Sequence, residues 1–209
     1  MMRYSWNNGN KINVIFYLTI SSVTAYPFVE SGVNMLFELL AKLLPSFNIV
    51  ISKAQSSLLS IFSVSLLFKI IDWSFDKYLW KNKYLLKILD MHDFSGKWQG
   101  MLQSSYNEVM EIPVILEIEQ TWRTINCRCE FPNTNSTSVA DMVQIDTSDM
   151  QSPVLKFTYK NQSRAMSTAL QFHVGYNELR LVDGKLKGFY FTNREQPTKG
   201  NMLLSKVSE

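Results

Sequence analysis

The sequence predicts a chain of two unlike parts: a helical membrane anchor over residues 1–92 and an all-β domain over residues 93–209. Residues 12–29 and 54–68 contain no charged side chain. After residue 92 the sequence changes to short alternating segments rich in Val, Ile, Phe, Tyr and Thr, which is typical of strands. We therefore expect two transmembrane helices followed by an eight-stranded antiparallel β-barrel.

The first uncharged segment, residues 12–29, is long enough to cross a bilayer. In helical geometry about 18 residues span about 27 Å, close to the hydrocarbon thickness. It is longer than the apolar part of a usual signal peptide and lacks an Ala-x-Ala cleavage site, so we expect it to be retained. The second span covers about 49–71, with Lys69 near enough to its end to reach the interface. Residues 31–44 between the spans have helical spacing; they either lie flat on the membrane or continue the first helix.

Lysines that follow the second span indicate the orientation of the anchor. Lys77, Lys81, Lys83 and Lys87 lie within a charged, aromatic juxtamembrane helix over residues 72–90. Positive residues mark the cytoplasmic side of a membrane. The loop over residues 30–53 has no such bias. We expect the N-terminus and the β-barrel to be cytoplasmic and the short loop to lie outside.

The all-β part divides into strands separated by short turns. Asp183-Gly184 between two alternating segments is a strong hairpin signal. A meander of about eight strands closes most economically as a small barrel, which leaves no free edges and has room for one small ligand. The predicted strands are 94–104, 111–120, 122–131, 137–146, 153–160, 168–182 (one bent strand, or two at 168–174 and 177–182), 185–193 and 199–207.

Several predicted inward faces begin apolar and end polar, which is typical of a small-molecule site. Tyr159 and Asn161 end one such face. Tyr190, Thr192 and Arg194 end another. Arg123 lies in line with Ile125, Cys127, Cys129 and Phe131, and its neighbour Trp122 completes the candidate ligand-binding set. Aromatic rings stack on flat bases and guanidinium groups bind phosphate. The alternative is that these residues sit at strand ends and only meet water.

The sequence gives little support for an enzyme. It contains no G-x-S-x-G, Walker, H-E-x-x-H or G-x-G-x-x-G motif. Of the two histidines, His92 and His173, we expect His173 to be a partly buried hydrogen-bonding residue. Cys127 and Cys129 point to the same side of a strand, so they favour small core side chains over a disulfide or a metal site. We expect no catalytic residue, no metal and no cofactor. The net charge of +3 also argues against a DNA or RNA polymer as partner.

Small residues on the second span form a possible contact face. Ser52, Ser56, Ser60 and Ser63 follow helical spacing and share one side of a helix. Small hydroxyl residues allow close packing of helices in lipid. The face therefore favours homo-oligomerisation; the alternative is that serine is only tolerated there.

Four segments of the β part resemble a known family. They are DFSGKWQGMLQSSY at 93–106, VLKFTYKNQS at 154–163, FHVG at 172–175, and LKGFYFTNR at 186–194 with Gly200 after it. Together with two transmembrane helices and a lipocalin-like barrel, they resemble the membrane effectors of CBASS, bacterial cyclic-oligonucleotide-based anti-phage signalling. The resemblance covers the whole chain in order.

The resemblance implies a mechanism for the chain. A cognate nucleotidyltransferase would make a cyclic dinucleotide, and the cytoplasmic barrel would bind it. The transmembrane segments would then oligomerise and disrupt the bacterial inner membrane, which kills the infected cell. Two other functions remain open: a membrane-anchored barrel that binds an apolar ligand or lipid, and an anchored structural protein with a filled barrel.

Overall fold

The chain forms two compact units in a computed structural model. The structure describes residues 2–3, 5–6, 10–43, 53–105, 110–134, 136–149, 151–163 and 173–207. One unit joins Met1–Asn8 to Trp80–Glu209, and the other is Gly9–Leu79. The predicted boundary near residue 92 stays a prediction; by contacts, the first residues and the segment from Trp80 group with the β part.

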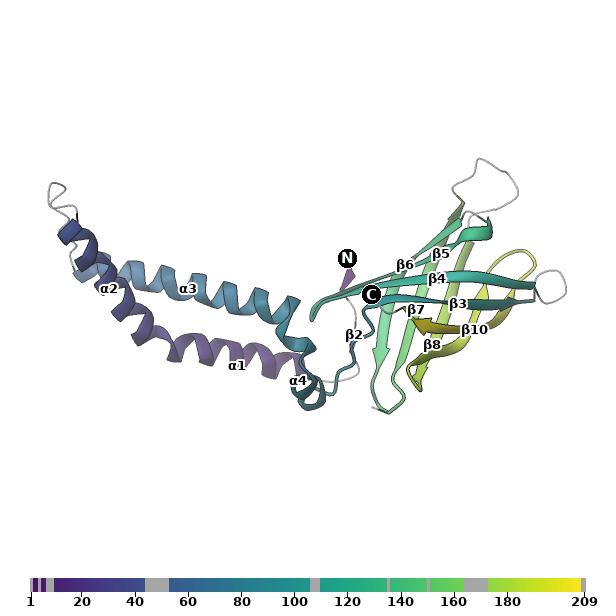
Figure 1. Cartoon of the computed structure of the whole chain (residues 1–209), viewed down its shortest axis with the longest axis horizontal. Helices are drawn as coiled ribbons and strands as arrows, with labels where there is room; N and C mark the ends of the chain where they lie inside the picture. The colour runs from purple at the N-terminus through teal and green to yellow at the C-terminus, as the bar shows by residue number, and fades with distance from the viewer. Residues whose placement is uncertain are drawn as a thin grey trace. The chain divides into compact units, whose positions relative to one another are not determined.

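The β part is a closed barrel of eight antiparallel strands, as the alternation predicts (Figure 1). Each strand pairs with the next, β10 returns to β3, and β5 pairs with β6. The 173–182 part of the predicted bent strand is one strand. The strands are β3 (Gly96–Ser104), β4 (Met110–Gln120), β5 (Thr124–Phe131), β6 (Ser136–Asp146), β7 (Val154–Ser163), β8 (His173–Val182), β9 (Lys185–Thr192) and β10 (Lys199–Lys206).

Two short strands at the start of the chain lie in the same sheet. β1 (Met2–Arg3) runs antiparallel to β5, and β2 (Ser5–Trp6) runs parallel to β6. Direct pairing of β5 with β6 covers only residues 128–131 of β5. Where the two strands diverge, β1 and β2 pair with the backbone edges that they leave open. The N-terminal segment is therefore part of the barrel sheet.

One end of the barrel is closed by large side chains and by hydrogen bonds to the chain that enters it. Phe94 is fully buried, and Trp98 is 3% exposed. The indole N–H of Trp98 donates to the carbonyl of Phe94 at 3.0 Å. The backbone N–H of Phe94 donates to the side-chain oxygen of Gln120 at 2.8 Å. These bonds satisfy the polar groups that burial at this end removes from water.

The segment from Trp80 to β3 belongs to the same compact unit as the barrel. It contains a 3₁₀ turn η2 (Leu79–Lys81) and a short helix α4 (Lys83–Ile88). Trp80 is fully buried. Lys81 forms an ion pair with Asp93 at 3.6 Å and donates to the hydroxyl of Ser95 at 2.8 Å. The contacts of Lys81 thus tie this segment to the residues that enter β3.

The other unit is a helical hairpin in which α1 (Asn10–Thr24) and α2 (Tyr26–Leu43) lie along α3 (Lys53–Lys77) (Figure 1). Only Ala25 separates α1 from α2, and its N–H donates to the carbonyl of Ser21 at 3.1 Å. Residues 31–43 therefore continue the first helix. Over the described ranges, none of these helices combines the length and the apolar character that a bilayer crossing needs.

Candidate ligand-binding site

Polar side chains gather inside the barrel at the end opposite to Trp98. The register fixes this placement, because Gly96 pairs with Ile118 at one end of β3 and Ser104 pairs with Met110 at the other. The polar residues come from strands around the barrel and from the β9–β10 connection, and each is at most 6% exposed. They are Ser104, Ser138, Asn161, His173, Thr192 and Thr198.

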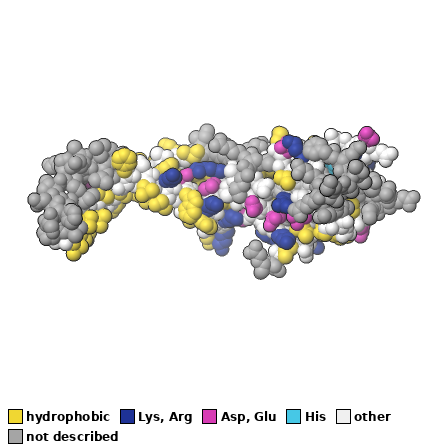
Figure 2. All heavy atoms as spheres, turned by 90° about the horizontal axis from the view of Figure 1, so that it is seen from above, with side chains coloured by type: hydrophobic (Ala, Val, Ile, Leu, Met, Phe, Trp, Pro, Cys, Tyr) yellow, Lys and Arg dark blue, Asp and Glu magenta, His cyan; other side chains and the backbone are white. Residues whose placement is uncertain are grey.

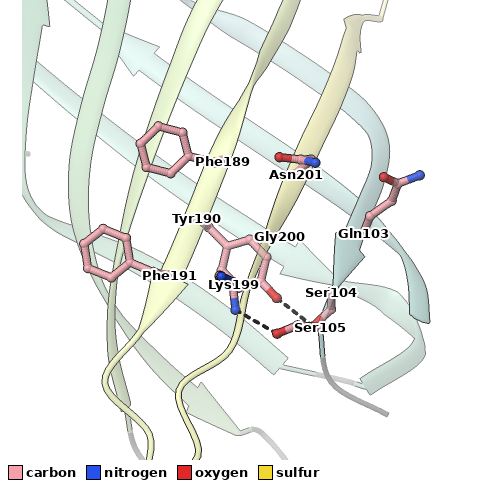
Figure 3. Close-up of a pocket in the computed structure, with 9 residues that line it drawn as sticks. All are labelled: Gln103, Ser104, Ser105, Phe189, Tyr190, Phe191, Lys199, Gly200 and Asn201. Atoms are coloured by element: carbon pink, nitrogen blue, oxygen red, sulfur yellow. Dashed lines mark hydrogen bonds between the residues drawn. The ribbon is translucent and has the colours of Figure 1, made fainter. Parts of the chain in front are cut away.

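Hydrogen bonds link these side chains to one another and to Tyr190. The hydroxyl of Tyr190 donates to that of Ser104 at 2.6 Å (Figure 3). The amide nitrogen of Asn161 donates to the hydroxyl of Ser138 at 2.8 Å. The hydroxyl oxygens of Thr192 and Thr198 are 2.9 Å apart. Tyr190, Asn161 and Thr192, all predicted from the sequence, therefore lie in the same polar layer and are held in fixed positions.

Arg194 brings a positive charge to this layer. One terminal nitrogen of its guanidinium lies 3.5 Å from Nε2 of His173, a long contact. Its Nε is buried and has no hydrogen-bond partner among the described residues. A guanidinium offers five N–H donors in a planar fork. Arg194 can therefore still bind an anion, such as a phosphate, in this layer.

Tyr159 stands beside this charge with a neutral phenol. Its ring lies edge-on to that of His173, with centroids 6.3 Å apart. Burial raises the pKa of the Tyr159 hydroxyl well above its usual range, so the group is protonated at neutral pH. It can donate or accept a hydrogen bond and can stack on a flat ring. Tyr159 is 6% exposed.

Below the polar layer the interior is mostly apolar. Phe157 and Leu155 precede Tyr159 on the inward face of β7, and both are at most 2% exposed. Leu179 on β8 and Leu186 on β9 are fully buried. An apolar floor with a few placed polar groups above it is the arrangement expected of a small-molecule site.

Two of the predicted site residues lie elsewhere. Arg123 is exposed, so its expected inward position is wrong. Residues 121–123 form the turn between β4 and β5, and a turn does not continue the alternation of a strand. Trp122 is 4% exposed in the same turn, at the Trp98 end of the barrel. The structure brings together Tyr159, Asn161, Tyr190, Thr192 and Arg194 and leaves these two apart.

A shallow hollow of about 470 Å³ lies on the outside of the barrel, over β3, β9 and β10 (Figure 3). Its walls are mostly apolar and include the exposed rings of Phe189 and Phe191. Tyr190 and Ser104 also border it, because Gly200 between them carries no side chain. The hollow contains the single cation Lys199 and few converging donors, so the interior layer is the better candidate for an anionic ligand.

The sequence did not reveal several members of the polar layer. Ser104 and Ser138 lie at or near strand ends and Thr198 lies in the β9–β10 connection, where small polar residues usually indicate turns. Asn177 is 2% exposed on the inward side of β8, in line with Gly175 and Leu179. Period-two alternation counted from His173 would have found it.

The chain matches known proteins mainly through its barrel. Residues 89–206 match the family model described as Cap15, cyclic dinucleotide receptor domain. The chain is 31% identical over 138 residues to CD-NTase-associated protein 15 of Yersinia aleksiciae, a match that covers 64% of each protein. A protein of that name from Escherichia albertii is 29% identical over 66% of this chain and 75% of its own length. The one from Staphylococcus schleiferi is 26% identical over 64% and 71%.

The family match covers more than half of the chain and includes every strand from β3 to β10. It confirms the resemblance to CBASS effectors that the four quoted segments indicate. The barrel, its polar inner layer and these matches lead to one conclusion: the chain belongs to the family of Cap15 proteins with a cyclic dinucleotide receptor domain.

Proposed function

We propose that this protein is a CBASS effector whose barrel binds a cyclic dinucleotide in the polar layer of its interior. One observation carries the placement: Tyr159, Asn161, Tyr190, Thr192 and Arg194 converge at one end of a closed barrel. Arg194 is the cation for a phosphate, and the two tyrosines are the rings on which bases stack. The receptor class of the matched family supports a ligand with both features.

The role proposed for the barrel is recognition and not turnover. Its tyrosine, asparagine and threonine hydroxyl and amide groups are hydrogen-bonding groups of ordinary reactivity. His173, which lies in the polar layer, contacts the guanidinium of Arg194 at 3.5 Å. The ligand would be a signal made by a cognate nucleotidyltransferase. The barrel would bind this ligand and would not convert it.

Calorimetric titration of the full chain in detergent micelles with cyclic dinucleotides tests the binding site. Arg194→Ala removes a charge-assisted contact to phosphate, and we expect affinity to fall roughly ten- to a hundredfold. The affinity of Tyr190→Ala should fall by a similar factor. Tyr190→Phe keeps the ring, so its affinity should stay within a few-fold of that of the parent. Arg180→Ala is the matched control, because Arg180 is exposed and contacts Ser152 at 3.3 Å.

Three results would contradict the proposed site. If the parent binds no cyclic dinucleotide, the receptor function is wrong for this chain. If Arg194→Ala binds like the parent, the phosphate is held elsewhere. If the protein binds lipids or other apolar ligands and the Arg194 variant does not change this, the barrel is a carrier for apolar molecules.

We further propose that the helical unit is the membrane part of the protein. Many of its large apolar side chains are exposed, among them Phe16 (59%), Phe28 (79%) and Phe62 (72%), and hydrophobic side chains are visible along it in Figure 2. Hydroxyl groups on α1 donate to carbonyls one turn earlier: Thr19 to Ile15 and Ser22 to Leu18, each at 2.8 Å. Such bonds satisfy hydroxyls inside lipid. Assembly of this unit on ligand binding would disrupt the bacterial inner membrane.

Labelling with an impermeant thiol reagent tests the orientation. The native thiols, Cys127 and Cys129, are buried, and burial raises the pKa of Cys129 to about 12, so neither should react in the folded protein. A new cysteine near residue 44 should be labelled in intact cells, and one at the exposed Ser205 of the barrel should be labelled only after lysis. The reverse pattern would invert the proposed topology.

A further inference from the structure

Asn177 is a buried amide whose side-chain oxygen has no hydrogen-bond partner in the part of the chain that the structure describes. It lies in the middle of β8 and is 2% exposed. Its Oδ1 makes no hydrogen bond to any described residue. A buried acceptor without a donor loses its bond to water and gains nothing in return, so such groups are rare in folded proteins. The position of the Asn177 oxygen therefore calls for an explanation.

The neighbours of Asn177 cannot supply the missing donor. Its cross-strand partner on β7 is Phe157, which has no polar group, and its partner on β9 is Tyr190. The hydroxyl of Tyr190 is committed to Ser104 at 2.6 Å. The residues before and after Asn177 on the same inward face are Gly175 and Leu179, which have no side-chain donor either.

Asn177 nevertheless lies next to the proposed ligand site. It is directly opposite Tyr190 in the β8–β9 ladder, so the two side chains start about 5 Å apart on the same face. On its other side Tyr190 is opposite Gly200, and its ring lies over that residue, with Cε1 2.9 Å from where a Cβ atom at position 200 would be. A flat base stacked on the face of the ring that is turned toward β8 would bring its edge to the amide of Asn177.

We propose that Asn177 reads the edge of the bound base: its free oxygen accepts a hydrogen bond from the exocyclic amino group of a purine. This rests on the proposed function and extends it to ligand choice. An amide is well suited to this task, since asparagine pairs with the amino edge of adenine in protein–nucleic acid contacts. The acceptor that folding leaves unpaired would be paired when the ligand enters.

Two ligand pairs test this with the unmodified chain. Cyclic di-GMP and cyclic di-IMP differ only in the exocyclic amino groups of guanine. Cyclic di-AMP and its purine-riboside analogue differ only in those of adenine. For at least one pair we expect the amino-bearing member to bind roughly tenfold or more tightly to the full chain in detergent. Equal affinity within both pairs would overturn the inference while leaving the proposed function intact.

A variant tests the same contact from the protein side. Asn177→Leu removes the unpaired acceptor and keeps a side chain of similar volume. We expect its melting temperature without ligand to be equal to or above that of the parent, its affinity for the preferred ligand to fall roughly ten- to a hundredfold, and its preference within the pair to disappear. The control is Asn201→Leu, the same change at an exposed position on β10, which should alter none of these.

The two kinds of failure are distinguishable. If Asn177→Leu melts lower and loses affinity equally for both members of a pair, Asn177 is structural and the inference is wrong. If the variant binds and discriminates like the parent, the inference is wrong as well. If the parent binds no cyclic dinucleotide, the proposed function fails first, and this inference fails with it.

Discussion

Tyr159 on β7 fills the space that Gly175 leaves open on β8. The two residues are cross-strand partners, and a Cβ atom on residue 175 would overlap the phenol ring and hydroxyl of Tyr159. The backbone of β9 leaves no room on the other side, because the same Cβ would lie 2.8 Å from the carbonyl oxygen of Phe191. The absence of one side chain therefore sets the position of a candidate ligand-binding ring.

Gly175→Ala should destabilise the barrel and displace Tyr159. Overpacking of a closely packed interior typically costs about 1–3 kcal/mol. We expect the free energy of unfolding of the barrel to fall by that amount and cyclic dinucleotide affinity to fall with it. Gly32→Ala is the control, since nothing lies within 4 Å of a Cβ atom there. Unchanged stability in Gly175→Ala would mean that Tyr159 can rotate away freely.

The N-terminal residues should stabilise the seam between β5 and β6. Met2 pairs with Ile125 on β5, and Ser5 pairs with Gln144 on β6. Proline at positions 3 and 5 removes one backbone N–H from each of these two short strands. We expect the free energy of local opening at the seam to fall by about 1–3 kcal/mol.

Hydrogen–deuterium exchange of the full chain measures this change. Amides of residues 124–126 and 143–146 should exchange faster in the Arg3→Pro/Ser5→Pro variant, and amides of β9 should not change. Equal exchange at the seam in both proteins would show that β1 and β2 contribute nothing to barrel closure. The N-terminal strands precede the helical unit in the sequence and the barrel strands follow it. The helical unit is therefore connected at both of its ends to segments of the barrel unit.

The sequence predicts the barrel well because its signal is repeated strand after strand. Alternation in β7 and β9 correctly orients Tyr159, Asn161, Tyr190 and Thr192 toward the interior. It fails at Arg123, because this residue lies in the turn before β5, where period-two alternation no longer applies. Alternation identifies a face only inside a strand, and strand ends are the least certain part of such a prediction.

Other parts could not be read from the sequence for physical reasons. β1 and β2 have two residues each, too few for a periodic pattern, and their stability comes from backbone pairing to strands far along the chain. The side-chain oxygen of Asn177 has no hydrogen-bond partner among the described residues because of its neighbours: Phe157 has no polar group, and the hydroxyl of Tyr190 is bonded to Ser104. Both features depend on tertiary register.

Asp146 should give the barrel an acid-sensitive contact. Its carboxylate accepts hydrogen bonds from the N–H and hydroxyl of Ser148, at 3.1 and 2.7 Å, and pairs with Lys156 at 3.2 Å. These bonds, led by those of Ser148, lower the pKa of Asp146 to about 2. A lowered pKa in the folded state means that the ionised form stabilises the fold. This stabilisation is present above pH about 4 and is lost as the pH falls toward 2.

Urea denaturation between pH 6 and pH 2.5 measures this contribution. Asp146→Asn should be less stable than the parent at pH 6, and the difference should shrink as the pH falls below 4. Asp183→Asn is the control, because that side chain is 86% exposed and lies 4.0 Å from its lysine partner. A difference that stays constant across the pH range would mean that the carboxylate charge of Asp146 is not what stabilises the fold.

The serine face of α3 should couple ligand binding to assembly of the membrane unit. Ser56 and Ser60 lie one turn apart on α3. Ser63, on the same side, is half-buried, and Ser52 lies outside the described residues. Leucine side chains are compatible with lipid, so the variant with leucine at positions 56 and 60 should still insert into the membrane. The bulk would separate neighbouring helices and remove two hydrogen-bonding groups worth about 0.5–2 kcal/mol each.

The barrel should keep its affinity for a cyclic dinucleotide in this variant, while cross-linking in membranes and dye entry into cells should both decrease. Ser65→Leu is the matched control, because Ser65 is exposed and lies about half a helical turn around from Ser56. It should assemble like the parent. If the double variant also assembles and permeabilises cells like the parent, the serine face is passive, and the surface that joins the copies must lie on α1, α2 or the barrel.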